Sequence, residues 1–306
     1  MPELPEVEVT RRQIAPLLIG RVIAAVETTK PSYFFLTKPA RLARALAGRR
    51  VQALERHGKY LIGRLDDGSR LLLHLGMTGQ LFGAGVSSPR LLSSTAQASL
   101  TPEQQRQGFA PDVHTHLRLR FEDGGPDVFF RDTRKFGKVF WLAGGEAHPR
   151  LARLGTDALG ASGALLFAAT RGRRQSRAAS RRRAKPSRAA IKSLLLDQSI
   201  LAGVGNIYAD EALFLAGVRP TRSAARVTRR ECDAIVRGLH QVLERSIETG
   251  GSSISDYVGP DGRDGEYQSE RRVYARRGEP CSTCATPIAR VVIGARSSHY
   301  CPRCQR

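Results

Sequence analysis

The stretch LLLDQSILAGVGNIYADEALF (194–214) determines the organisation of the second half of the chain. Its last part predicts a short helix from about Ile207 to Leu215, and AGVGN (202–206) before it predicts a tight turn. Glycines in such a turn leave backbone N–H groups exposed at the helix N-terminus, which suits a phosphate group. A plain turn explains the same glycines equally well, so the ligand stays open at this point.

A longer amphipathic helix is predicted further along the chain. TRRE (228–231) has the pattern of a capping box, in which Thr228 caps the helix and Glu231 reaches back. Gly250-Gly251 marks the end of this helix. One apolar stripe follows the capping box with helical spacing: Cys232, Ile235, Val236, Leu239, Val242, Leu243 and Ile247. Its cysteine is therefore expected to be a small core residue.

The other four of the five cysteines lie in the last 26 residues. CSTC (281–284) and CPRC (301–304) are separated by sixteen residues, which gives the pattern C-x2-C-x16-C-x2-C. Each pair places two thiolates on one knuckle, and two knuckles supply the tetrahedral ligand set of a structural Zn²⁺. The residues between the pairs alternate as in a β-hairpin. We therefore expect one zinc ion with four ligands: Cys281, Cys284, Cys301 and Cys304.

The first half of the chain has mainly β character. Residues 51–75 alternate like strands, with DDGS (66–69) as a hairpin turn. HLRLRF (116–121) alternates strictly, and VFFRDTRKFGKVFWL (128–142) predicts further strands. Residues 6–18 predict a helix in front of them. A β-sandwich preceded by a helix is the expected architecture.

Charge is the strongest global signal in this chain of 306 residues, because 49 Lys and Arg against 28 Asp and Glu give a net charge of +21. Such an excess favours a polyanionic partner, either nucleic acid or an anionic membrane surface. The sequence has neither a long apolar run nor a secretion-signal pattern, which favours nucleic acid and a cytosolic protein. Residues 171–192 hold ten Lys or Arg and no acid, and they predict a basic linker. A polar stretch at 83–113 predicts a long surface loop.

The chain opens with MPELPEVEVT (1–10). If the methionine is removed, Pro2 becomes an N-terminal secondary amine beside Glu3 and just ahead of a helix. An unperturbed α-amino group has a pKa near ~7.7–8.0. A helix N-terminus keeps more of such an amine neutral and nucleophilic. The opening is thus either a nucleophile or an ordinary chain end, and these residues alone leave both possibilities open.

Six motifs occur in a fixed order along nearly the whole chain: PELPEVE (2–8), GKYL (58–61), HLGMTG (74–79), DTRKFG (132–137), the 194–214 stretch and the terminal CxxC pairs. This ordered set resembles the bacterial formamidopyrimidine-DNA glycosylase family of repair enzymes, which also contains endonuclease VIII. PELPEVE and DTRKFG are similar to the branch that acts on oxidised purines. The chain departs from the family pattern in its extended 83–113 loop and its long basic linker.

The resemblance implies an α+β fold with an N-terminal β-sandwich domain, flanking helices, a helix–two-turn–helix domain and a zinc-finger β-hairpin. It also implies that DNA binds between the two halves. On this basis we predict four regions: a catalytic domain at 1–148, a basic linker at 149–190, the helix–two-turn–helix domain at 191–268 with a lesion-facing loop near 252–267, and the zinc finger at 269–306.

The resemblance further implies a bifunctional DNA glycosylase and AP lyase that excises oxidised purines (8-oxoguanine and formamidopyrimidines) from duplex DNA in base excision repair. Pro2 would attack the sugar C1′, expel the base and form an iminium ion, which a secondary amine cannot neutralise by losing an N–H proton. That charge acidifies the C2′ proton and drives β,δ-elimination. Glu3 matches the general acid/base that protonates the sugar oxygen. Lys59 matches a lysine that contacts phosphate and assists elimination, and Arg296 matches a residue that assists the second elimination.

Other positions match family residues that contact DNA. Met77, Arg134 and Phe136 match the wedge that fills the gap left by the flipped nucleotide. Outside this motif context, a methionine or phenylalanine is more often a core residue. The positions that match contacts with the DNA backbone are His74, His114, Arg188, Asn206 and Arg296.

Two alternatives stay open. One is an endonuclease VIII-like glycosylase for oxidised pyrimidines. The other is a noncatalytic zinc-containing nucleic-acid-binding protein, which would need neither the Pro2-Glu3 pair nor the wedge. The main interpretation predicts damaged double-stranded DNA as the partner and a structural Zn²⁺ as the cofactor. It also predicts a monomer with no membrane association and no required protein partner, located in the bacterial cytoplasm at the nucleoid.

Overall fold

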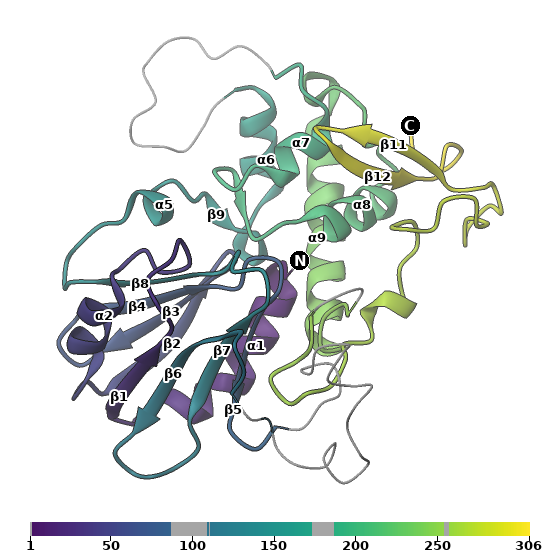
Figure 1. The fold of residues 1–306 in the computed structure, drawn as a ribbon. Helices are drawn as coiled ribbons and strands as arrows, with labels where there is room; N and C mark the ends of the chain where they lie inside the picture. The colour runs from purple at the N-terminus through teal and green to yellow at the C-terminus, as the bar shows by residue number, and fades with distance from the viewer. Residues whose placement is uncertain (1, 87–108, 110, 173–186, 254–256) are drawn as a thin grey trace, which may run out of the picture. The chain divides into compact units, whose positions relative to one another are not determined.

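The computed structural model describes residues 2–86, 109, 111–172, 187–253 and 257–306 (Figure 1). Within it the chain divides into two compact units. The first comprises Met1–His148 and Ile247–Gln268, and the second comprises Pro149–Ser246 and Ser269–Arg306. Most of the predicted 83–113 loop, residues 173–186 of the predicted basic linker and residues 254–256 of the predicted lesion-facing loop lie outside the described residues.

Two four-stranded antiparallel sheets form the framework of the first unit (Figure 1). One sheet has the strand order β1-β6-β7-β5 and the other has the order β2-β3-β4-β8. The strands are β1 (Ile23–Thr28), β2 (Val51–His57), β3 (Tyr60–Leu65), β4 (Arg70–His74), β5 (Gly79–Gly83), β6 (Thr115–Phe121), β7 (Val128–Asp132) and β8 (Lys138–Leu142). The two sheets share one apolar core, to which Leu73 and Phe130 contribute from opposite sheets. This arrangement is the predicted β-sandwich.

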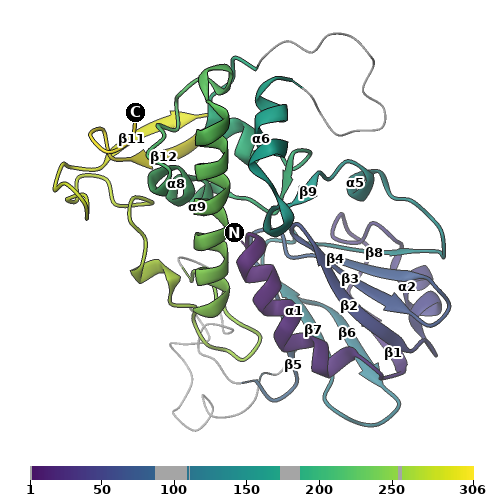
Figure 2. The same cartoon turned by 180° about the vertical axis from the view of Figure 1, so that it is seen from behind.

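Helix α1 (Leu4–Leu18) packs against β2, β3 and β5 (Figure 2). It begins after Glu3, which has extended backbone geometry and serves as the N-cap. Ile14 and Leu18 lie on its inner face and are at most 3% exposed, because an apolar residue every three to four positions returns to the same side of a helix. Helix α2 (Pro39–Leu46) packs against β1 and β8.

Helices dominate the second unit. Its elements are α5 (Pro149–Ala152), β9 (Thr156–Asp157), η2 (Ala158–Gly160), α6 (Gly163–Thr170), α7 (Ile191–Leu196), β10 (Leu201–Ala202), α8 (Asn206–Leu215), η3 (Ala224–Arg226), β11 (Ala289–Ile293), β12 (Arg296–Tyr300) and most of α9 (Arg229–Glu248). The end of α9 and η4 (Tyr267–Ser269) cross the chain boundaries between the units. The region predicted as a basic linker therefore starts with folded elements. Its first part is apolar, and Ala158 and Leu166 are completely buried, which explains why it packs.

Helix α9 has the predicted capping box. The Glu231 carboxylate accepts a hydrogen bond from the Thr228 backbone N–H at 2.8 Å, and the Glu231 N–H donates to Thr228 Oγ1 at 3.2 Å. Cys232 and the other residues of the predicted apolar stripe are buried. Burial raises the pKa of the Cys232 thiol to about 12, as expected for a core residue.

Among helices within the described ranges, none is both long and apolar enough to cross a membrane.

The residues between the two cysteine pairs form the predicted hairpin. Strands β11 and β12 pair in antiparallel register from Ala289 opposite Tyr300 to Ile293 opposite Arg296. Gly294 and Ala295 connect them with φ values of +55° and +60°. Positive φ at both turn residues matches the right-handed twist of the two strands, so the hairpin can be this short.

Candidate active site and metal centre

The start of helix α1 brings together the first residues of the chain. Pro2 is buried, and Glu3 is only 2% exposed. One oxygen of the Glu6 carboxylate accepts a hydrogen bond from the Glu3 N–H at 2.8 Å, which completes a capping box. The other accepts a hydrogen bond from the Ser252 N–H at 2.9 Å. The start of the predicted lesion-facing loop is thereby joined to the helix end that carries Pro2 and Glu3.

Lys59 lies in the two-residue turn between β2 and β3. His57 and Tyr60 pair directly across the turn, so Gly58 and Lys59 alone make the connection. Gly58 has φ +57°, a conformation that glycine adopts without the steric cost of a side chain. The Lys59 side chain is only 9% exposed, which restricts its freedom far more than a solvated surface lysine would be restricted.

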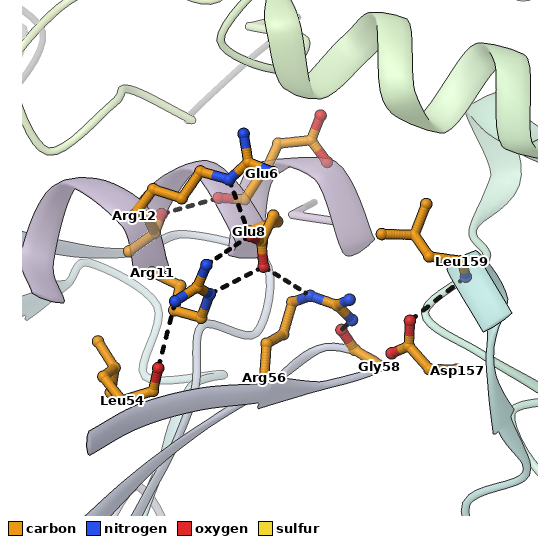
Figure 3. Close-up of polar contacts among 10 residues, drawn as sticks. Glu6, Glu8, Arg11, Arg12, Leu54, Arg56, Gly58, Asp157 and Leu159 are labelled. Atoms are coloured by element: carbon orange, nitrogen blue, oxygen red, sulfur yellow. Dashed lines mark hydrogen bonds and ion pairs between the residues drawn. The ribbon is translucent and has the colours of Figure 1, made fainter. Parts of the chain in front are cut away.

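A charge cluster around a buried carboxylate lies between helix α1 and the end of β2 (Figure 3). Its centre is Glu8, which accepts hydrogen bonds from Arg11 at 2.8 and 3.0 Å, from Arg12 at 2.9 Å and from Arg56 at 3.1 Å. Burial alone would raise the pKa of Glu8, but the hydrogen bonds from the three arginines outweigh it and lower that pKa to about 2. This cluster was not predicted from the sequence, although Glu8 follows directly after the PELPEV part of the opening motif.

Met77 and Phe136 are exposed apolar side chains on two adjacent loops. Met77 is 38% exposed and Phe136 is 46% exposed. Neither side chain is therefore buried in the core, which is where a methionine or phenylalanine is more often found. The Arg134 guanidinium lies 5.4 Å from the centroid of the Phe136 ring. The loops touch through their backbones, because a Cβ atom on Gly76 would lie only 2.4 Å from the Phe136 carbonyl carbon.

Asp132 connects the two loops that carry Met77 and Phe136. Its carboxylate is completely buried and accepts hydrogen bonds from the hydroxyl group of Thr78, from the Arg134 N–H at 3.2 Å and from the Gly137 N–H at 2.7 Å. One carboxylate therefore restrains both loops that present the predicted wedge. Asp132 is the first residue of DTRKFG, yet no role was predicted for it, because its partner in the other loop is distant in the chain.

The two histidines predicted to contact DNA lie at strand ends. His74 ends β4, its ring lies 4.7 Å from that of Tyr60, and its Nδ1 accepts a hydrogen bond from the Gly76 N–H at 3.0 Å. A neutral His74 therefore carries its proton on Nε2. His114 is half-buried just before β6. Burial lowers the pKa of the neighbouring His116, which is 1% exposed and belongs to the core.

The second unit carries the other predicted DNA contacts. Arg188 and Arg296 are exposed, and Arg296 is the first residue of β12, next to the hairpin turn. Asn206 is the first residue of α8, and its Nδ2 donates a hydrogen bond to the Ser297 carbonyl at 3.0 Å. Asn206 thus joins the start of α8 to the hairpin strand that presents Arg296.

A completely buried ion pair fixes the hairpin to the helices. The Lys192 ammonium lies 2.7 Å from the Asp210 carboxylate and donates to the Ser297 carbonyl at 3.1 Å. Asp210 also accepts hydrogen bonds from the Ser298 hydroxyl at 2.7 Å and from the His299 N–H at 2.8 Å. The charges are compensated, so their burial is tolerated. Lys192 is the last residue of the basic stretch at 171–192, and its pairing with Asp210 was not anticipated from the sequence.

Glu211, which follows Asp210 in α8, binds the segment that leads into the zinc finger. Glu211 is completely buried and accepts backbone N–H bonds from Arg272 at 2.8 Å and from Val273 and Tyr274 at 2.9 Å. Burial raises the pKa of Glu211, while these three hydrogen bonds favour its charged form. Asp210 and Glu211 therefore hold two separate segments, strand β12 and residues 272–274, against one helix.

The four predicted zinc ligands form one cluster. The sulfur atoms of Cys281, Cys284, Cys301 and Cys304 all lie within 4.8 Å of one another. The distance from Cys284 to Cys301 and to Cys304 is 3.4 Å, and that from Cys281 to Cys304 is 3.9 Å. Tetrahedral Zn²⁺ with Zn–S bonds of ~2.3 Å places its sulfurs roughly 3.8 Å apart, whereas a disulfide requires ~2.05 Å. Hydrogen bonds from Thr286 lower the pKa of Cys284 to about 6, whereas the contact with the Cys284 sulfur raises the pKa of Cys304 to about 12.

The cluster fits one structural zinc ion, as predicted. Four protein ligands leave no open position for a substrate, so the zinc would stabilise the finger and take no part in the reaction. The predicted site residues otherwise fall into two groups. Those in the first unit are Pro2, Glu3, Lys59, His74, Met77, His114, Arg134 and Phe136, and those in the second are Arg188, Asn206 and Arg296.

Family models match three consecutive regions of the chain. The formamidopyrimidine-DNA glycosylase N-terminal domain matches residues 1–139, and the H2TH domain of the same enzymes matches residues 170–258. A zinc finger found in FPG and IleRS matches residues 278–306. These matches define a class of zinc-finger DNA glycosylases with an H2TH domain.

Individual relatives resemble the chain over its full length. The formamidopyrimidine-DNA glycosylase of Solibacter usitatus is 40% identical over 306 residues, covering 100% of both chains. The crystal structure of the MutM (Fpg) protein from Thermus thermophilus is 35% identical with a TM-score of 0.78, covering 99% of this chain and 98% of that one. The Lactococcus lactis Fpg in complex with Fapy-dG-containing DNA is 29% identical with a TM-score of 0.79, covering 99% and 100%.

The chain belongs to the formamidopyrimidine-DNA glycosylase family. This membership confirms the family that the ordered motifs predicted, the α+β fold class, and the enzyme class of DNA glycosylase and AP lyase. It also removes the alternative of a noncatalytic zinc-containing binding protein.

Proposed function

We propose that the chain excises oxidised purines, 8-oxoguanine and formamidopyrimidines, from duplex DNA and then cleaves the strand at the resulting abasic site. The observation that carries this proposal is the buried Pro2-Glu3 pair at the N-terminus of α1 in a chain of this family. The Lactococcus lactis relative was solved with DNA that contains Fapy-dG, a lesion of the proposed class.

Pro2 is the proposed nucleophile. Its nitrogen, freed by removal of Met1, attacks the sugar C1′, and the base leaves with the electron pair of the glycosidic bond. The N-terminus of α1 points its positive end toward this amine, which favours the neutral, nucleophilic form. Glu3, restrained in the capping box with Glu6, protonates the sugar oxygen as the ring opens.

The iminium ion then drives two eliminations. Loss of the C2′ proton expels the 3′ phosphate, and a second elimination expels the 5′ phosphate. Lys59 contacts a phosphate and assists elimination, and its small exposure keeps the ammonium group near one position. Arg296, exposed beside the hairpin turn, assists the second step.

The remaining predicted residues bind the duplex in this proposal. Met77, Arg134 and Phe136 fill the gap left by the flipped nucleotide, which is consistent with the exposure of Met77 and Phe136. The backbone phosphates are contacted by four residues: His74, His114, Arg188 and Asn206.

We extend the proposal to the organisation and setting of the enzyme. The domain at 1–148 carries the nucleophile, the helix–two-turn–helix domain at 191–268 binds the duplex, and the zinc finger at 269–306 contributes Arg296. The partner is damaged double-stranded DNA, in keeping with a net charge of +21. One lesion needs one enzyme molecule, so we propose a monomer without a required protein partner, located in the cytoplasm at the nucleoid.

Borohydride trapping tests the nucleophile and the reaction class together. Untagged protein is mixed with a duplex that contains 8-oxoguanine opposite cytosine, and borohydride reduces the iminium to a stable crosslink. We expect a crosslink that maps to residue 2 by mass spectrometry and is strongly weakened in Pro2→Gly. Protein that retains Met1 is the control and should give none.

A parallel duplex with an oxidised pyrimidine distinguishes the related branch. Faster trapping on that duplex would assign the chain to an endonuclease VIII-like specificity. Absence of a crosslink on both duplexes, with removal of Met1 verified by mass spectrometry, would refute Pro2 as the nucleophile.

A further inference from the structure

The guanidinium group of Arg56 connects the turn that carries Lys59 to helix α1. Arg56 is the second-last residue of β2, and its Nη1 donates a hydrogen bond to the Gly58 carbonyl at 3.0 Å. Its Nε donates to Glu8 of α1 at 3.1 Å (Figure 3). The planar fork of arginine makes such a bridge in two directions possible.

Both members of this bridge are buried. The side chains of Arg56 and Glu8 are each 8% exposed, in contrast to the ordinary surface pairs of the chain. Arg11 adds a second connection, because it donates to Glu8 and also to the Leu54 carbonyl in β2 at 3.4 Å. These hydrogen bonds therefore fix the position of α1 relative to β2. They are strengthened because the Glu8 carboxylate is largely shielded from water.

We propose that Arg56 and Glu8 are positioning residues that fix the Gly58-Lys59 turn relative to the helix end bearing Pro2 and Glu3. This inference rests on the proposed function, because it assigns to the pair the task of placing the Lys59 ammonium group for elimination. Neither residue touches DNA in this proposal.

The physical reason lies in the shape of the turn. Two residues connect the strands, and the Arg56 guanidinium holds the carbonyl group of the first of them, Gly58. Removal of the Arg56 fork takes away a donor to the turn carbonyl and leaves the Glu8 charge with two partners in place of three. A displacement of a reacting group by about 1 Å can lower a catalytic rate by roughly 10²-fold.

The test measures two rates in single-turnover experiments: release of 8-oxoguanine, and strand cleavage at a preformed abasic site. For Arg56→Gln we expect strand cleavage to slow by roughly tenfold or more, with a smaller effect on base release. The matched control is Arg64→Gln, which breaks an exposed arginine–glutamate pair on the same two strands and should change neither rate more than about twofold.

A double-variant comparison separates positioning from general destabilisation. If Arg56 acts through Lys59, then Arg56→Gln should slow strand cleavage much less in a Lys59→Ala background than in the wild type. Equal slowing in both backgrounds would overturn the proposal. The proposal would also be overturned if Arg56→Gln cleaved the strand as fast as Arg64→Gln. If the wild-type protein still formed the Pro2 crosslink, the proposed function would remain intact.

A second variant covers the case in which Arg56→Gln does not fold. Arg56→Lys keeps a positive charge beside Glu8, but a single ammonium group cannot reproduce the two-direction fork. We expect folded protein with an intermediate loss of strand cleavage, and full wild-type cleavage in Arg56→Lys would contradict the proposal. A wild-type enzyme that gives no crosslink would instead refute the proposed function.

Discussion

At the scale of single residues, buried carboxylates position much of the candidate site. Glu6 joins the helix start to the Ser252 backbone, and Asp132 joins the two loops that carry Met77 and Phe136. Each carboxylate accepts hydrogen bonds from backbone or side-chain donors that would otherwise be buried without a partner. Loss of such an acceptor costs about 1–3 kcal/mol for each donor left unsatisfied.

Glu8 gives this arrangement a dependence on pH. Its pKa is about 2 in the folded protein and 4.5 in the reference state, so its contribution to stability is present above pH 4.5 and is lost as the pH falls toward 2. This difference corresponds to at most about 3 kcal/mol at neutral pH. We expect Glu8→Gln to lower the free energy of unfolding near pH 7. The difference in free energy of unfolding between the variant and the wild type should disappear as the pH falls from 4.5 to 2.

Urea titrations at a series of pH values measure this gap. The control is Glu55→Gln, which removes an exposed carboxylate from β2 and should change the free energy of unfolding by less than about 0.5 kcal/mol. A gap for Glu8→Gln that stays constant down to pH 2 would contradict the assignment of the lowered pKa to this cluster.

At the scale of elements, the finger is attached to helix α8 by neighbouring carboxylates. Asp210 holds strand β12, and Glu211 holds the segment at 272–274 that leads into the finger. The zinc cluster closes the finger internally, but it does not explain how the hairpin is held against the helices. That task falls to the buried pair of Lys192 and Asp210.

Lys192→Met tests this attachment. The variant leaves the Asp210 charge buried without its cation, so we expect the free energy of unfolding to fall by about 3–5 kcal/mol. Zinc content, measured by release with a thiol reagent, should stay at one ion per chain because the four cysteines are unchanged. Arg229→Met, which breaks an exposed pair, should cost no more than about 1 kcal/mol. Loss of zinc in Lys192→Met would show that the pair and the metal site are not separable.

At the scale of the whole molecule, positive charge governs the association of the chain with DNA. The net charge of +21 predicts strong, sequence-independent attraction to DNA phosphates. A protein with about six to ten phosphate contacts loses roughly 10³–10⁵-fold in affinity between about 50 and 200 mM salt. We expect a decrease of this size for undamaged duplex, measured by fluorescence anisotropy, and a nearly flat salt dependence would refute a phosphate-dominated interaction.

The zinc ligands and the capping box were accessible from sequence because they depend on local patterns. The zinc ligands follow from CxxC spacing, the α9 capping box from TRRE, and the roles proposed for Pro2, Glu3 and Lys59 from ordered motifs that resemble one family. The folded start of the predicted linker was not anticipated, because the basic residues from 171 onward dominate the composition of that region.

By itself the sequence determined the β character of the first half, helices α8 and α9, the finger hairpin, the metal ligands and the family, since each depends on residues close together in the chain or on a motif read as a unit. Only the tertiary structure decided which side chains support those motifs. Arg56 meets Glu8 across 48 positions, and the Asp132 carboxylate meets Thr78 across 54. Pairs separated this far have no periodic signal, because the fold of the backbone between them sets their distance.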